Sequence, residues 1–218
     1  MTPLPDDVSF AAGATLGIPC MTAWCCLFGD GPIAGQTVLV TGGAGAVGHY
    51  AVQLAKGGGA RAIATVSSPL KAEQARLAGA DLVIDYRNED VVAKTLAFTG
   101  QRGVDRVVDV DFGGNVATTL KLMAMNSTIA VYATNGNRNP VVPVRELMEK
   151  CIALRALVLP ALPPPLHAAA QADISKWLAA GPRIHNVAAQ FPLSQTAQAH
   201  LAVEKGNKLG TVVVDCAA

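Results

Sequence analysis

Short runs of apolar, often β-branched residues alternate along most of the chain with longer stretches whose apolar positions recur at helical spacing. The runs are continuously apolar, a pattern typical of strands in a parallel sheet that is covered on both faces. Six such strands separated by helices predict a doubly wound α/β fold. The expected strands are 37–41, 62–66, 82–85, 106–110, 128–132 and 155–159, and the expected helices between them are 46–57, 69–79, 89–98, 114–125 and 143–152.

The pattern changes after residue 159, where prolines interrupt the chain. This α+β tail has too little apolar surface for a core of its own, so it is expected to dock on the sheet domain or to complete a domain supplied elsewhere. We divide the chain into a sheet domain with a leading linker helix, 1–180, and a C-terminal segment, 181–218. The elements expected here are a helix at 166–180, an extended piece at 187–191, a helix at 195–205 and a strand at 211–215.

The sequence VLVTGGAGAVGHYAVQLAK places a glycine-rich loop between an expected strand and an expected helix. Its Gly43-x-Gly45-x-x-Gly48 spacing is the dinucleotide-binding pattern of Rossmann folds. We expect Gly43 to permit the tight turn, Gly45 to let the backbone approach a pyrophosphate, and Gly48 to let the helix pack closely on the strand. Ala46 and Val47 would then lie at the helix start, where free N–H groups face the phosphates. A glycine-rich turn without a ligand is the alternative.

The residues after the second expected strand indicate which dinucleotide binds. An NAD site places an acid there to accept from the ribose 2′-hydroxyl, whereas this chain reads TVSSPLK with no acid before Glu73. Ser68 can cap the next helix, and Lys71 falls in its first turn, where a cation opposes the helix dipole. A 2′-phosphate bound by Ser67, Ser68 and Lys71 would offset that cost. The sequence therefore predicts NADPH, with a solvated surface lysine as the alternative.

Composition and charge exclude several other classes. Of 218 residues, 51% are hydrophobic and 15% charged, so the chain can bury a sizeable core and is not intrinsically disordered. A net charge of +1 offers no basic excess for nucleic acid or an anionic membrane. The uncharged stretches 8–29 and 31–55 are broken by proline and glycine and do not resemble spanning helices. Because the first basic residue is Lys56, no signal peptide is expected, and the predicted location is the cytoplasm.

Cysteine and histidine positions give no metal motif. The five cysteines include no CxxC pair, so neither a disulfide framework nor a four-thiolate zinc site is expected. The adjacent Cys25 and Cys26 are expected to pack as small apolar residues. The histidines have neither metal-ligand spacing nor a catalytic-triad pattern, and we interpret all of them as ordinary surface or partly packed residues: His49, His167, His185 and His200.

Five segments occur in order along nearly the whole chain: AAGATLGIPCMTAW, the glycine loop, LAGADLVIDYRNED, VVDVDFGGN and FPLSQTAQAH…GNKLGTVVV. Together they resemble the zinc-independent quinone oxidoreductases, the ζ-crystallin-like branch of the medium-chain dehydrogenases/reductases. The resemblance implies a two-domain, NADPH-dependent reductase, usually a homodimer, that acts on quinones or α,β-unsaturated carbonyls (enones).

The resemblance also implies a further domain. The family's GroES-like catalytic β-barrel would precede Met1, so this chain is expected to begin at the linker into the cofactor domain. The segment 181–218 resembles the part of the family's chain that returns to the catalytic domain. We therefore expect the cofactor half to be present and most of the substrate pocket to be missing, which leaves the substrate and the catalytic residues open.

The resemblance also implies that three individual residues contact the cofactor. Thr22 resembles a threonine that contacts the nicotinamide carboxamide, Tyr86 a tyrosine near the adenosine phosphate, and Lys208 a position close to the nicotinamide. The alternatives are a helix threonine bonded to its own backbone, an amphipathic surface ring and a solvated loop lysine, respectively.

The end of the fifth expected strand is a further candidate. Ala133, Thr134 and Asn135 lie there, at the carboxyl edge where open sheets bind ligands. Asn135 resembles an asparagine that meets the cofactor. Because it precedes Gly136, a turn asparagine is the alternative.

Related alcohol dehydrogenases use zinc, and the sequence offers a test of that reading. The resemblance implies that the third catalytic zinc ligand of those enzymes is a cysteine, four residues before the threonine that corresponds to Thr22 of the Thr22–Ala23 pair. Here that position is Ile18, which cannot ligate a metal, and Cys20 is two residues out of place. The zinc-free branch is the better match.

Two other functions stay open beside the reductase. A non-catalytic NADPH-binding or sensor module is supported by the missing domain. An S-adenosylmethionine methyltransferase also uses a glycine loop after its first strand, but it is disfavoured because no acid follows the second strand to hold the ribose hydroxyls.

The expected sixth strand, 155–159, indicates a homodimer. It lies at one edge of the sheet and is apolar apart from Arg155, and Pro160 ends it. Such an edge is a template for another chain unless it is covered. A two-fold axis there would pair the strand with its own copy, and the resemblance implies the same edge. The alternative is a monomer in which the proline-rich segment 160–165 covers the strand.

Overall fold

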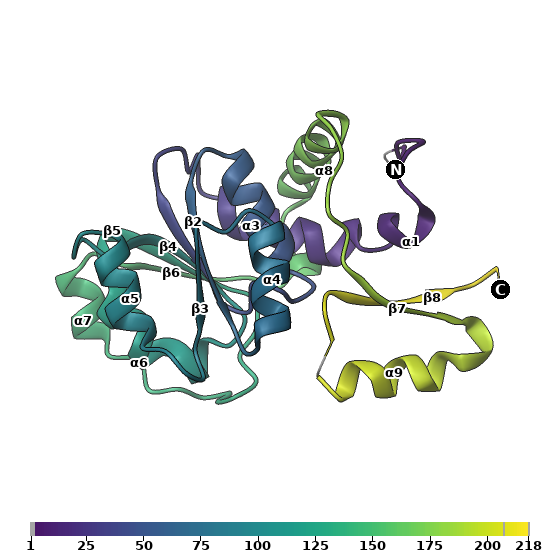
Figure 1. The fold of residues 1–218 in the computed structure, drawn as a ribbon. Helices are drawn as coiled ribbons and strands as arrows, with labels where there is room; N and C mark the ends of the chain where they lie inside the picture. Colours follow the sequence, from purple (N-terminus) through teal and green to yellow (C-terminus); the bar gives the residue numbers. More distant parts are fainter. Residues whose placement is uncertain (1–2, 207, 218) are drawn as a thin grey trace.

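A six-stranded parallel sheet forms the centre of the computed structural model, which describes residues 3–206 and 208–217 (Figure 1). Its strand order is β3-β2-β1-β4-β5-β6, and every neighbouring pair is parallel. The order reverses between β1 and β4, which confirms the predicted doubly wound fold. The strands are β1 (Thr37–Val40), β2 (Arg61–Val66), β3 (Leu82–Asp85), β4 (Val104–Asp109), β5 (Met123–Val131) and β6 (Ala153–Ala156).

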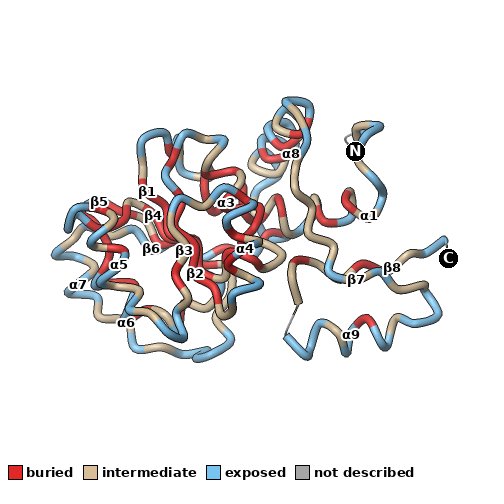
Figure 2. The backbone as a smooth tube through the Cα atoms, in the orientation of Figure 1, coloured by how far each residue is buried: buried red, intermediate tan, exposed pale blue. Residues whose placement is uncertain are grey.

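Helices cover both faces of this sheet. On one face α2 (Met21–Phe28), α3 (Gly48–Gly57), α4 (Pro69–Leu77) and α8 (Pro164–Ala179) share one apolar core with the strands. On the other face α5 (Val91–Phe98) and α6 (Phe112–Leu122) share a second core, and α7 (Val144–Glu149) lies against its rim through Leu147. Figure 2 shows the buried residues gathered in the strands and in the helix surfaces that face them. The central strand β1 is fully buried and β2 and β4 nearly so, which explains why their sequences are largely apolar.

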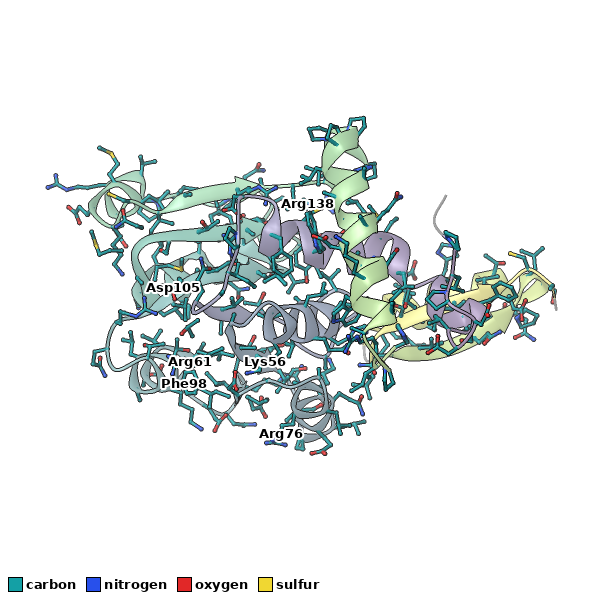
Figure 3. All side chains as sticks on the ribbon, turned by 90° about the horizontal axis from the view of Figure 1, so that it is seen from above. Lys56, Arg61, Arg76, Phe98, Asp105 and Arg138 are labelled. Atoms are coloured by element: carbon teal, nitrogen blue, oxygen red, sulfur yellow. The ribbon has the colours of Figure 1, made fainter. Side chains whose placement is uncertain are left out.

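The amino ends of the strands are held by structural contacts. The Arg61 guanidinium lies 4.5 Å from the centre of the Phe98 ring and donates to Thr37 Oγ1 at 3.0 Å (Figure 3). Asp105 accepts from the Thr37 N–H at 2.7 Å. These contacts tie α5, β1, β2 and β4 together at the end of the sheet opposite the glycine loop.

Several boundaries differ from the expectation, most clearly between α6 and β5 and at the end of β6. The helix expected to run to 125 ends at Leu122, and the chain continues directly into β5, where Asn126 takes a φ of 55° and the register shifts. The sixth strand ends at Ala156 instead of 159. Leu157 still donates to Val131 O, and a 3₁₀ turn, η2 (Leu159–Ala161), then leads toward α8.

The N-terminal segment forms more helix than the single linker helix that was expected. α1 (Phe10–Gly13) is followed by a π-helical turn, η1 (Leu16–Cys20), which leads directly into α2. Cys25 and Cys26 are buried in α2, as predicted. Two arginines hold the C-terminal carbonyls of this helix: Arg155 donates to Cys25 O at 2.6 Å, and Arg106 donates to Cys26 O at 3.0 Å.

The C-terminal segment forms the predicted α+β tail. Its elements are β7 (Val187–Pro192), a 3₁₀ turn η3 (Leu193–Gln195), α9 (Thr196–Glu204) and β8 (Thr211–Asp215), with β7 and β8 paired in parallel. Figure 1 shows this small sheet beside the main one, and it buries little: only Ala199 and Val213 are buried within its described helices and strands. It docks at the glycine loop, where the Gly210 N–H donates to Ala44 O at 3.1 Å.

Candidate functional site

The glycine loop joins β1 to α3 at the carboxyl edge of the sheet, and its glycines have different steric roles. Gly42, with a φ of 67°, makes the tight turn that we expected from Gly43. Gly43 instead packs on β2, because a Cβ there would lie 2.6 Å from the Ala64 Cβ. A Cβ on Gly48 would lie 2.2 Å from the Gly42 carbonyl oxygen, so the first turn of α3 can close onto the loop only without one.

Two cavities adjoin at this edge, and we call them together the carboxyl-edge crevice. They share Gly42, Tyr86 and Val110. The first, of about 500 Å³, lies between the ends of β1 and β3 and helix α6. The second, of about 360 Å³, lies between the glycine loop, the end of β2 and the tail. The second cavity brings together seven of the sequence-predicted site residues: Gly45, Ala46, Val47, Ser67, Lys71, Tyr86 and Lys208.

The second cavity has a positive lining. Lys71 donates to Ser67 Oγ at 3.1 Å, and Lys208 donates to Gly210 O at 2.7 Å. Burial lowers the pKa of Lys208, and the nearby positive charge of Lys71 lowers it further. No carboxylate lines this cavity among the residues that the structure describes. Two cations held close together without an acid make a site that an anion would stabilise.

Ser68 has a different place from its neighbour. Its Oγ accepts from the Lys71 N–H at 3.4 Å, so it caps α4, as the sequence indicated. It does not line the crevice. The cap positions the first turn of α4 and, with it, the Lys71 side chain beside Ser67.

A buried carboxylate under the crevice was not found by sequence reasoning. Asp109, at the end of β4, is fully buried. Its Oδ1 accepts from Thr41 Oγ1 at 2.9 Å, from Asn115 Nδ2 at 2.7 Å and from the Asp111 N–H at 3.0 Å. Thr41, Asp111 and Asn115 all line the first cavity. The available signal was an acid directly after the apolar pair Val107–Val108 of an expected buried strand, because a buried acid requires polar partners.

Tyr132 is a second functional candidate that the sequence reading missed. It follows β5 and lines the second cavity together with Val110. Burial raises the pKa of its hydroxyl far above the usual value, so the group stays protonated and able to donate a hydrogen bond. The signal available in the sequence was its place at the carboxyl end of a central strand.

Other predicted site residues lie outside the crevice. Thr22 is buried within α2 and lines neither cavity. Thr134 lines a separate cavity of about 460 Å³ between the ends of β5 and β6, and its Oγ1 accepts from the Gly113 N–H at 3.0 Å. Ala133 O accepts from the Phe112 N–H at 3.1 Å, while Asn135 is exposed. In this structure these three residues shape the turn that follows β5.

The interpretation of the histidines needs one correction. His49 is fully buried, contrary to the expectation of a surface or partly packed residue, because the tail covers it. Its Nδ1 donates to Gly45 O at 2.9 Å, and its Nε2 accepts from the Asn186 N–H at 3.4 Å. Burial lowers the pKa of His49 to about 4. His185 and His167 are partly buried, and His200 is exposed on α9.

The described part of the chain shows neither a metal-binding cluster nor a membrane-spanning helix. Within residues 3–206 and 208–217, no group of three or more His, Cys, Asp or Glu side chains is placed to hold a metal ion. In the same ranges, the helices are too short or too polar to cross a membrane.

Comparison with known proteins gives one family and a set of relatives. The profile of the family described as zinc-binding dehydrogenase matches residues 46–172. Human quinone oxidoreductase is 26% identical over 200 residues, covering 90% of this chain and 60% of the relative. The mouse protein is 28% identical over 222 residues, covering 97% and 65%. The chain therefore spans less than two thirds of the length of these relatives.

Two solved structures extend the similarity to the fold. A mycobacterial protein complexed with NADPH superposes with a TM-score of 0.88 at 27% identity, covering 98% of this chain and 68% of that one. Quinone oxidoreductase from Escherichia coli, also complexed with NADPH, superposes with a TM-score of 0.87 at 26% identity, with the same coverage.

The packing of Gly48 on the loop leads to a stability prediction. The substitution Gly48→Ala should lower the free energy of unfolding by about 1–3 kcal/mol, because the new methyl group would push against the backbone carbonyl of Gly42. Gly17→Ala is the matched control, since nothing lies within 4 Å of its Cβ position. Urea unfolding of the three proteins measures both effects. Equal stability of wild type and Gly48→Ala would contradict this account of the loop.

Proposed function

The chain belongs to the zinc-binding dehydrogenase family, and we propose that it binds NADPH as the cofactor-binding part of a quinone oxidoreductase. The similarity to quinone oxidoreductases of two mammals supports the activity, and the two NADPH-bound neighbours support the cofactor. The proposed substrate is a quinone or an enone.

One observation carries the choice of NADPH: Lys71 and Lys208 face the same cavity, beside the glycine loop, with no carboxylate in its described lining. An NAD site would place an acid after β2 to accept from the ribose 2′-hydroxyl. Ser67 stands there instead, bonded to the Lys71 ammonium at 3.1 Å. Two ammonium groups and a hydroxyl suit the charge and the oxygen atoms of a 2′-phosphate.

The loop fits the remainder of the dinucleotide. Gly45, Ala46 and Val47 line the second cavity, so their backbone would approach a pyrophosphate without side-chain obstruction at Gly45. Tyr86 and Val110 stand between the two cavities and would contact the adenosine end. The protonated Tyr132 hydroxyl would donate to an oxygen of the cofactor.

When bound, NADPH would supply a hydride from the nicotinamide C4 to the quinone or enone, and solvent would supply the proton that completes the reduced product. The chain's own residues bind and orient the cofactor in this scheme. We assign none of them as an acid or base.

We propose that this chemistry proceeds without zinc, despite the name of the family. Ile18 stands where the zinc-dependent relatives have a cysteine ligand, and its side chain cannot coordinate a metal. Cys20 and Cys26 instead pack in the apolar core, and burial raises the pKa of each thiol to about 12. No step in the proposal is routed through a metal.

We also propose that residues 181–218 pack with a catalytic domain like that of the longer relatives. The β7–β8 pair and α9 bury few side chains, and two strands alone are marginally stable. Further protein surface against this sheet would bury more of it.

We propose a homodimer through the outer edge of β6. This strand lies at the end of the sheet, and Leu154 and Ala156 are exposed. Leu157 donates to Val131 O, so by the alternation of a strand the N–H groups of Leu154 and Ala156 point away from β5. They are free to pair with a second copy, and the exposed strand argues against coverage by segment 160–165.

Calorimetric titration tests the cofactor. We expect NADPH to bind more tightly than NADH, and Lys71→Ala to weaken NADPH binding by about tenfold or more while changing NADH binding little, because the lost ammonium would contact only the 2′-phosphate. Lys176→Ala is the matched control, since Lys176 lies outside the crevice on α8. Equal affinity for NADPH and NADH in the wild type would rule out the 2′-phosphate site.

A turnover assay separates the reductase from a non-catalytic NADPH-binding module. We expect NADPH to be oxidised in the presence of 9,10-phenanthrenequinone or a small enone. The measurement is the loss of absorbance at the nicotinamide band of NADPH. Tight NADPH binding without turnover by the longest natural form of the protein would favour the sensor module.

Light scattering after size exclusion tests the interface. We expect a dimeric wild type and a monomeric Ala156→Pro variant, because proline removes the outward N–H while leaving the bond from Leu157 to β5 in place. Ala156→Ser keeps that N–H and serves as the matched control. A monomeric wild type or a dimeric proline variant would refute this interface.

A further inference from the structure

We infer that His49 is a positioning residue of the proposed NADPH site, holding the Ala46 N–H toward the phosphates and latching the tail that carries Lys208. The inference rests on the proposed function. His49 lines neither cavity of the crevice, because it is fully buried beneath the loop. Its effect would pass through two neighbours, the Gly45–Ala46 peptide and Asn186.

The first neighbour is a peptide of the glycine loop. Gly45 O accepts from His49 Nδ1 at 2.9 Å and from the His49 N–H at 3.2 Å, so one residue holds this carbonyl with two hydrogen bonds. The described peptides include no cis bond, and in a trans peptide the C=O and N–H point in opposite directions. Because the carbonyl is drawn into the protein, the Ala46 N–H of the same peptide is turned outward. Ala46 lines the second cavity.

The second neighbour belongs to the tail. The Asn186 N–H donates to His49 Nε2 at 3.4 Å, and Asn186 O accepts from the Thr211 N–H at 2.8 Å. Thr211 follows Gly210, which donates to Ala44 O and accepts from Lys208 Nζ. The imidazole therefore joins the loop to the short stretch of tail that brings the second ammonium to the crevice.

We call the hydrogen bond between His49 and Asn186 the latch. Two further side chains of α3 hold the neighbouring residues of the tail. Gln53, one turn after His49, donates to Ile184 O at 2.9 Å and accepts from the Ile184 N–H at 3.1 Å. The Tyr50 hydroxyl contacts His185 Nδ1 at 2.7 Å. Three consecutive tail residues are thus held by three side chains of α3. Among them only His49 also bonds to the glycine loop in the described structure.

The hydrogen bonds of His49 to Gly45 O and to the Asn186 N–H together require the neutral tautomer of the imidazole that is protonated on Nδ1. Nε2 accepts a hydrogen bond, so it carries no proton, and Nδ1 must carry the proton that it donates to Gly45 O. A replacement that offers one donor and one acceptor can preserve the arrangement, whereas an apolar ring cannot. This difference separates a positioning role from simple filling of space.

The experiment compares His49→Gln, which keeps a donor and an acceptor, with His49→Phe, which keeps a ring but has no polar atom. We expect the dissociation constant for NADPH, measured by titration, to rise about tenfold or more in His49→Phe and to stay within about threefold of wild type in His49→Gln. His200→Phe, on exposed α9, is the control for the same chemical change elsewhere.

Hydrogen–deuterium exchange on the wild type supplies a second measurement that needs no variant. NADPH should slow exchange not only in the loop, at 44–48, but also at 184–186, which lies outside the crevice and is joined to the loop through His49. This readout decides the matter if His49→Phe fails to fold.

The outcomes separate the two proposals. A wild type that does not bind NADPH overturns the proposed function and the positioning role with it. Binding by the wild type with an unchanged dissociation constant in folded His49→Phe, or with no protection at 184–186, overturns the positioning role alone. Equal weakening in His49→Phe and His49→Gln also overturns it, because the rescue by a donor and an acceptor would be absent.

Discussion

The close approach of α3 to the end of β1 is the constraint on which the rest of the site depends. The space between Gly48 and the Gly42 carbonyl is too small for any side chain, and Gly43 also packs too closely on Ala64 of β2 to carry one. With these contacts made, the first turn of α3 stands directly over the switch between β1 and β4. Gly45, Ala46 and Val47 of the loop then line the crevice, and His49 is carried to the place where the tail docks.

The polar groups under the crevice are arranged around this packing. Asp109 is placed by β4 beside Thr41, which directly follows β1, so one carboxylate oxygen ties the ends of the two central strands to the start of α6 through Asn115. Buried polar groups of this kind are stable only when bonded, which couples the shape of the first cavity to the register of β1 and β4. The second cavity has the opposite character, because its charged groups are cations whose partner would be a ligand.

The sequence was sufficient for the sheet and the loop because their signals are local. Continuous apolar runs marked all six strands, and Ser67, Ser68 and Lys71 lie close together in the sequence. The end of β6 was misplaced because residues 157–159 are as apolar as the strand: Leu157 and Leu159 leave the sheet to enter the core beneath α8. The end of α6 was misplaced because periodicity does not show that Met123 takes an extended conformation and begins β5. The burial of His49 depends on Asn186, 137 residues away, and no local pattern reports such a contact.

The position of Lys208 in the chain has a consequence for the order of events during synthesis. A ribosome releases the six strands and α8 well before it releases the segment that carries this lysine. The sheet and both its cores consist of residues before 180, apart from Leu209 at the margin, so they are able to fold as the chain emerges. The crevice acquires its second cation only when the tail returns to the loop. A nascent chain would therefore possess the folded sheet before Lys208 joins Lys71 at the crevice.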